Sequence, residues 1–276
     1  MAATISPSVP GAGARPTGPA RDPWWDRAGT ATLVLAGLSV AALFALRSLP
    51  ELDLAAARPF FEPRECAEGA PAGAVCGAFP LAYDATALAV RRVAYWIPYS
   101  AAIAAFLWLG WLTLLRAGKT VDDLRRALLA PLTVLLGPVL LVNVILKGQW
   151  GRPRPFQSEP FGGDAPFVLP GTLSDGCTSN CSFVSGEVSS AAWMLALVFL
   201  LPARLRWPAA AAVVAFTVAV SAGRIAFGRH YLSDAVMAAL LTATIVTATA
   251  WLLTRRPVLA ILRRWTVASN ARLALR

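Results

Sequence analysis

The chain has 276 residues, of which 57% are hydrophobic and only 14% are charged. A soluble domain of this length is normally about a quarter charged, so the composition excludes an ordinary soluble protein. The formal net charge is +10, but the sequence has no basic soluble domain with the aromatic platforms that nucleic-acid binding needs. We therefore predict an integral membrane protein with no nucleic-acid partner.

Residues 1–27 form an Ala-, Pro- and Gly-rich segment that we predict to be a disordered tail. Trp24 and Trp25 at its end occupy the position of an interfacial anchor. Six apolar blocks follow, each close to the ~20 residues that cross a bilayer. They are residues 28–46, 94–115, 128–146, 184–201, 207–223 and 235–253. Because backbone groups in lipid must pair internally, we expect an all-α protein with six transmembrane helices within residues 28–254.

The basic residues predict the orientation of these helices. Fifteen of the 25 Lys and Arg residues lie in the two terminal segments and in the connections between helices two and three and between helices four and five. The positive-inside rule places these segments in the cytoplasm, and both termini with them. Residues 255–276 are then a basic cytoplasmic tail. Residues 47–93 are then an outer, periplasmic cap between the first and second helices.

All four cysteines lie in the predicted outer segments. An even number of cysteines in an oxidising compartment favours disulfides. The simplest pairing joins Cys66 to Cys76 and Cys177 to Cys181. The alternative is that all four are free and pack as small hydrophobic residues.

Polar residues gather at three outer helix ends. KGQWGRPRP (residues 147–155) follows the third helix, CSFVSGE (181–187) opens the fourth, and GRIAFGRHYLSD (223–234) joins the fifth to the sixth. Cations beside a glycine at a helix start are typical of an oxyanion site, because helix N-terminal amides point at an anion. His230 is the only histidine, and Asp234 lies on the same helical face. A carboxylate on one ring nitrogen leaves the other free as a nucleophile or base.

Each cluster alone has an ordinary explanation. Lys147 could extend toward water from a helix end, and Arg152 and Arg154 could bind lipid headgroups. Ser185 could cap a helix in which Glu187 is favoured in the first turn. Three such clusters at the same ends of the helices make coincidence improbable. With no second histidine and no cysteine pair in the clusters, we expect neither a metal nor another cofactor.

The three clusters resemble the three motifs of the phosphatidic-acid phosphatase type 2 superfamily, which read K-x6-R-P, P-S-G-H and S-R-x5-H-x3-D. The matching segments are residues 147–155, 184–187 and 223–234, and the spacing within the first and third motifs is kept throughout. The resemblance covers the third to the sixth helix. It implies a membrane phosphatase with its active-site core in residues 147–234.

The resemblance also implies a role for each matching residue. His230 would attack phosphorus and form a phosphohistidine, Asp234 would orient it, and water would then release phosphate. Cations and amides would stabilise the transition-state charge without a metal. The phosphate oxygens would be bound by Lys147, Arg154, Arg224, Ser185 and the backbone amide of Gly186.

The sequence departs from the family motifs at three positions. Gly223 and Val184 replace a serine and a proline, which we expect to be tolerated. Glu187 replaces the second-motif histidine, which is thought to protonate the leaving oxygen or to hold the phosphate. Glu187 could be an acid in an enzyme with an acidic pH optimum, it could contact a substrate hydroxyl or the water, or the protein could be a degenerate lipid-phosphate binder.

A site at the outer headgroup level favours a membrane lipid phosphate as substrate. The candidates are phosphatidic acid, phosphatidylglycerol phosphate, undecaprenyl diphosphate and lipid A. Residues 177–187 resemble the second-motif region of bacterial lipid A phosphatases, so lipid A is favoured, and the expected location is the bacterial inner membrane with the site facing the periplasm. Phosphotransfer to a second lipid would use the same residues. A transporter would need ionisable groups near helix midpoints, and no protein partner is evident.

Overall fold

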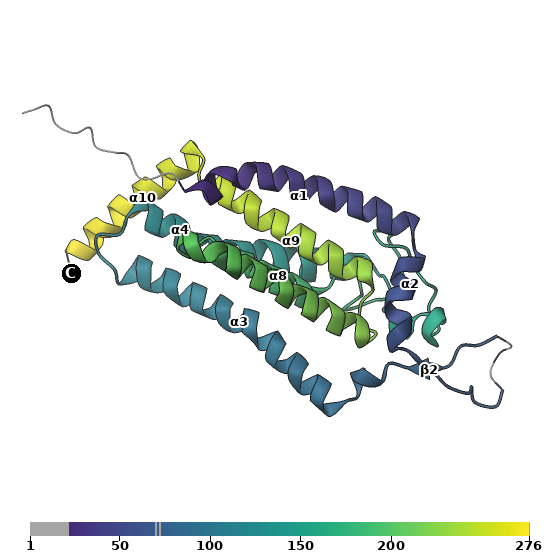
Figure 1. Cartoon of the computed structure of the whole chain (residues 1–276). Helices are drawn as coiled ribbons and strands as arrows, with labels where there is room; N and C mark the ends of the chain where they lie inside the picture. The colour runs from purple at the N-terminus through teal and green to yellow at the C-terminus, as the bar shows by residue number, and fades with distance from the viewer. Residues whose placement is uncertain (1–21, 70, 72, 276) are drawn as a thin grey trace, which may run out of the picture.

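The computed structural model describes residues 22–69, 71 and 73–275, so most of the predicted tail at residues 1–27 lies outside the described residues. Within the described part, five helices are long and apolar enough to cross a membrane. They are α1 (Pro23–Ser48), α3 (Ala85–Leu114), the continuous helix Val121–Gln149, α8 (Ala203–Ala226) and α9 (Leu232–Leu252) (Figure 1). Five of the six predicted blocks are therefore confirmed as helices of spanning length.

The remaining block, residues 184–201, differs from the predicted long helix. It forms α6 (Gly186–Trp193) and α7 (Leu195–Val198), which together make a short apolar segment. Met194 separates them, and backbone bonds to the third preceding residue continue from there to Leu201. Small side chains in α6 let it pack closely against its neighbours, and the indole of Trp193 donates to the Ala130 carbonyl at 3.0 Å.

The helix Val121–Gln149 changes its winding along its length. It begins as α4 (Val121–Val134), continues as the π-helical segment η3 (Leu135–Leu146) and ends as α5 (Lys147–Gln149). Pro138 has no backbone N–H and interrupts the regular hydrogen-bond pattern. The side-chain amide of Asn143 donates to the Pro138 carbonyl at 2.7 Å. Lys147 lies near the C-terminal end of this helix.

The cap between α1 and α3 is built from short elements. They are α2 (Glu51–Ala57), η1 (Arg58–Phe60), the antiparallel strands β1 (Glu62–Pro63) and β2 (Gly77–Ala78), and η2 (Pro80–Ala82). A disulfide joins Cys66 to Cys76 and closes the hairpin. The second predicted disulfide, Cys177–Cys181, is also confirmed. The cap ends earlier than residue 93, because Asp84 accepts from the amide of Ala87 at 2.7 Å and starts α3.

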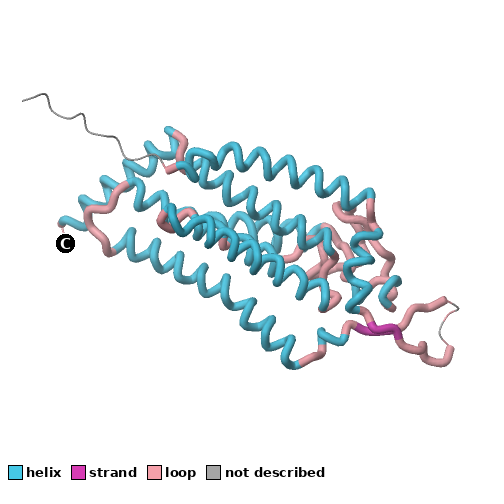
Figure 2. Tube along the Cα trace, in the orientation of Figure 1, coloured by secondary structure: helices cyan, strands magenta, loops and turns pink. Residues whose placement is uncertain are grey.

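The connection between α5 and α6 is irregular apart from two single turns, η4 (Pro155–Gln157) and η5 (Glu159–Phe161). Figure 2 shows loops gathered at the two ends of the helices, with most of them at the end that carries α2 and the hairpin. The three motif clusters lie at that end.

The opposite end holds the start of α1 and the helix α10 (Arg256–Ala274) (Figure 1). Most of the predicted tail at residues 255–276 is thus the helix α10, which packs against α3 and α4. Its Asn270 side chain donates to the Lys119 carbonyl at 2.9 Å. Trp25 is also more buried than an interfacial anchor. The residue is 1% exposed, and its ring contacts the ring of Phe199 and the guanidinium of Arg125.

Candidate active site

His230 lies in the turn between α8 and α9 and is 1% exposed. Its Nδ1 lies 2.8 Å from the Ser182 carbonyl oxygen. A carbonyl only accepts, so Nδ1 carries the proton and Nε2 keeps a free lone pair. Burial lowers the pKa of His230 to about 4, and Arg224 and Lys147 act in the same direction. The ring is therefore neutral near pH 7, as a nucleophile requires.

Asp234 lies near His230 but contacts it only weakly. The Nδ1 to Oδ2 distance is 3.7 Å, whereas the same carboxylate accepts from the Tyr231 amide at 2.9 Å and from the Ser182 hydroxyl at 2.5 Å. Ser182 thus contacts both residues, His230 through its carbonyl and Asp234 through its hydroxyl. Ser182 could not be predicted from the sequence, because a backbone acceptor leaves no side-chain signature.

The Asp234 carboxylate also belongs to a buried ion network centred on Arg152. Arg152 Nη1 donates to Asp234 Oδ1 at 2.6 Å and its Nη2 donates to Asp53 Oδ2 at 2.7 Å. Asp53, from the cap helix α2, accepts in addition from the amide and hydroxyl of Ser233 at 2.7 and 2.6 Å. The hydrogen bonds of the Arg152 guanidinium are thus made to other protein atoms. Asp53 escaped sequence analysis because an acid in the first turn of a helix is unremarkable.

Asn180 holds the two cations of the first motif. Lys147 Nζ donates to its side-chain oxygen at 3.2 Å. Arg154 donates to its backbone carbonyl from Nε at 3.1 Å and from Nη2 at 2.6 Å. Asn180 sits inside the Cys177–Cys181 loop with a φ of 50°, a left-handed conformation that asparagine tolerates. The disulfide loop therefore places both cations.

Two of the predicted phosphate ligands are buried polar atoms without a hydrogen-bond partner among the described residues. They are Ser185 Oγ and Arg224 Nε. Buried polar atoms are nearly always bonded, so such exceptions mark positions where a ligand or water belongs. Gly186 follows Ser185 and begins α6, and a Cβ there would lie 2.9 Å from Asn143 Oδ1 and 3.4 Å from Lys147 Nζ. The glycine lets the helix start lie next to the lysine.

Glu187 contacts two arginines. Arg91 of α3 donates to both carboxylate oxygens, from Nη2 at 2.6 Å and from Nε at 3.3 Å. Arg224 Nη1 lies 3.3 Å from Oε1. Two guanidinium groups favour an ionised carboxylate, so this geometry disfavours Glu187 as a proton donor. Arg91 was missed because it lies outside the three motifs.

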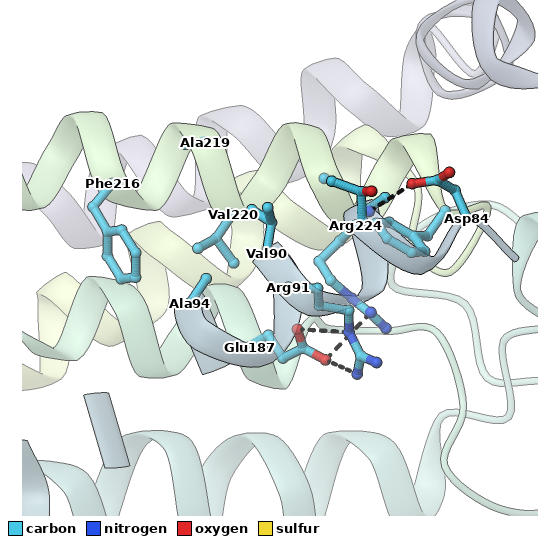
Figure 3. A pocket seen from close by; sticks show the side chains of 13 residues that line it. Asp84, Val90, Arg91, Ala94, Glu187, Phe216, Ala219, Val220 and Arg224 are labelled. Atoms are coloured by element: carbon cyan, nitrogen blue, oxygen red, sulfur yellow. Dashed lines mark hydrogen bonds and ion pairs between the residues drawn. The ribbon is translucent and has the colours of Figure 1, made fainter. Parts of the chain in front are cut away.

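An apolar groove of about 520 Å³ leads from these charges between α3 and α8. Figure 3 shows Arg91, Glu187 and Arg224 together at one part of the groove, and Phe216 and Val220 along its wall. In the described part of the chain, no cluster of three or more His, Cys, Asp or Glu side chains could hold a metal ion. The arrangement combines a neutral histidine, a set of anion-binding donors and a place for an apolar chain.

Comparison with known proteins gives a consistent family. The model of the PAP2 superfamily matches residues 126–257. The lipid A 4'-phosphatase of Rhizobium leguminosarum is 42% identical over 199 residues, which are 71% of this chain and 85% of the relative. That of Rhizobium etli is 41% identical over 199 residues, or 70% and 76%. That of Francisella tularensis subsp. novicida is 42% identical over 107 residues, or 37% and 46%. No solved structure matches the chain significantly.

Proposed function

The chain belongs to the PAP2 superfamily, and from that premise we propose that it removes a phosphate group from a membrane lipid, with lipid A as the favoured substrate. The family and the relatives identify the chain as a phosphatase-type hydrolase. The observation that carries the proposal for this site is the buried, neutral His230 together with the unpartnered donors Ser185 Oγ and Arg224 Nε.

In the proposed reaction, Nε2 of His230 attacks phosphorus while the bond from phosphorus to the lipid oxygen breaks. Arg224, Lys147 and Arg154 balance the charge on the three phosphate oxygens. The Ser182 carbonyl, which accepts from Nδ1, favours the positive charge that develops on the ring. Asp234 supports that charge from 3.7 Å.

The ionised state of Glu187 decides which group supplies the proton to the leaving lipid oxygen. Because two guanidinium groups contact its carboxylate, a water molecule supplies the proton to the leaving lipid oxygen. The hydroxide left by that water molecule then attacks the phosphohistidine, the N–P bond breaks, and inorganic phosphate leaves with His230 again neutral. In this reaction Glu187 neither donates nor accepts a proton.

The groove between α3 and α8 supports a lipid substrate. Its wall is apolar, and it adjoins Arg224, so an acyl chain in the groove would bring its headgroup to the cations. We propose six membrane crossings, with α6 and α7 as the fourth, and cytoplasmic termini. The start of α1 and α10 lie together, opposite the cap and both disulfides. Disulfides favour an oxidising compartment, which supports a bacterial inner-membrane protein whose site faces the periplasm.

The test is phosphate release by the protein in detergent, with EDTA present, from lipid A, phosphatidylglycerol phosphate and undecaprenyl diphosphate. His230→Ala is the nucleophile variant and Arg92→Ala, on the exposed face of α3, is the control. We expect release from lipid A that only His230→Ala abolishes. Phosphate appearing on a second lipid instead of in solution would indicate a phosphotransferase. No turnover of any lipid by a folded protein that still binds vanadate would indicate a binder.

A further inference from the structure

Arg91 is a charged residue on a spanning helix, and none of the three motif clusters includes it. Its side chain extends from α3 to α6 and binds both oxygens of Glu187 (Figure 3). It also lines the groove between α3 and α8. Arg92, the next residue of α3, is exposed, so Arg91 is the arginine of this helix that contacts the site.

Glu187 creates a problem for an anion site. Its Oε1 lies 3.3 Å from Arg224 Nη1, so the carboxylate is next to a cation that a phosphate needs. A carboxylate at this position would repel a phosphate dianion and compete with it for Arg224. Arg91 reduces both effects, because its guanidinium donates to both carboxylate oxygens while Arg224 Nε has no hydrogen-bond partner among the described residues.

We propose that Arg91 is a positioning residue that neutralises Glu187 and so keeps Arg224 available to the substrate phosphate. This inference rests on the proposed function, since it concerns the same anion site. Arg91 and Glu187 then act as one unit, and the arginine is required because the glutamate is present. Removing Arg91 leaves Arg224 as the partner of Glu187, which weakens phosphate binding and leaves His230 unchanged.

The test is a double-mutant cycle with Arg91→Ala, Glu187→Gln and the combined variant, with Arg92→Ala as the matched charge control. We expect Arg91→Ala to lower kcat/KM by roughly a hundredfold, mostly through a higher KM. We expect Glu187→Gln to remain within about tenfold of the parent, since a neutral amide does not compete for Arg224. The combined variant should recover to the level of Glu187→Gln, and Arg92→Ala should match the parent.

Vanadate, which mimics phosphate, provides a second readout that does not need turnover. Its affinity should fall in Arg91→Ala and recover in the combined variant, while thermal unfolding in detergent checks that each variant is folded. If Glu187→Gln alone abolishes turnover and the combined variant is equally inactive, the carboxylate itself is required and the inference is wrong. It is also wrong if Arg91→Ala binds vanadate like the parent. A parent that binds vanadate but releases no phosphate would contradict the proposed function, and the vanadate cycle would still decide the role of Arg91.

Discussion

The candidate active site holds two ion networks, and they differ in how completely their members are hydrogen-bonded. Around Arg152 the side chains are 0 to 1% exposed, and the guanidinium donates to Asp53, Asp234, Ser233 and the Val168 carbonyl. Around Glu187 the pair with Arg91 is 16% and 39% exposed, and Arg224 keeps an unpartnered Nε. We call these the closed and the open network.

The difference separates structural charges from ligand-binding charges of the same residue types. A closed network has no donor left for a ligand, and removing one member leaves a buried charge without compensation. In an open network some hydrogen-bond donors remain available to a ligand. Removing one member should therefore weaken ligand binding more than it destabilises the fold. Sequence alone places Arg152 and Arg154 in the same motif, and only the contacts distinguish them.

Arg152→Met should have the largest effect. It leaves Asp53 and Asp234 buried without their cation, and loss of one partner of a buried pair costs about 3–5 kcal/mol. The measurement is the free energy of unfolding in detergent. Arg58→Ala removes an exposed pair with Glu51, 3.7 Å apart, and should change stability by less than about 0.5 kcal/mol. Equal stability of Arg152→Met and the parent would contradict the closed network.

Arg224→Gln tests the open network. We expect kcat/KM for lipid phosphate to fall by about 10²- to 10³-fold, because a donor to the phosphate is lost in the transition state. The unfolding temperature should change little. A large loss of stability with normal turnover in the remaining folded protein would make Arg224 a structural residue.

The acid limb of the pH–rate profile tests His230, which lies 3.7 Å from Asp234 of the closed network and whose pKa is lowered by burial and by the charge of Arg224 in the open one. Burial lowers its pKa to about 4, against Asp234, which acts to raise it. The neutral, nucleophilic ring should therefore persist as pH falls from 6.5 to about 4, and kcat/KM should then decrease about tenfold per pH unit. Over the same window the unfolded chain takes up the proton and the folded chain does not, so stability decreases as pH falls. An acid limb near 6.5 would contradict this burial effect.

Opening the Cys177–Cys181 loop should have the smallest effect. With both cysteines replaced by serine, Asn180 no longer has a fixed position beside Lys147 and Arg154. We expect KM to rise about tenfold, because part of one charge-assisted hydrogen bond to the phosphate is lost. The corresponding double serine variant at Cys66 and Cys76 is the control, since no hydrogen bond joins the described residues of that hairpin to Lys147 or Arg154. Equal KM in the two variants would remove Asn180 from the anion site.

Local patterns account for what the sequence predicted. Hydropathy blocks predicted six spanning helices, of which five are confirmed as helices of spanning length, and the positions of the four cysteines predicted both disulfides. The missing parts depend on distant partners. Asp53 meets Arg152 across 99 positions and Arg91 meets Glu187 across 96. The division of residues 184–201 into the short helices α6 and α7 was not predicted, because hydropathy does not show where a helix ends within an apolar block. The motif residues lie together in the structure, and their roles stay predictions.

The ion pair between Asp53 and Arg152 limits how this chain can be divided into segments that keep the site intact. Residues 126–257 match the family model, yet the aspartate that completes their buried network arrives from α2, ahead of that segment. A chimera that transplants only the matching segment would separate Arg152 from its counter-ion. The smallest transferable unit therefore includes α2, and with Arg91 it extends into α3. The cap between α1 and α3 is in this sense part of the candidate active site.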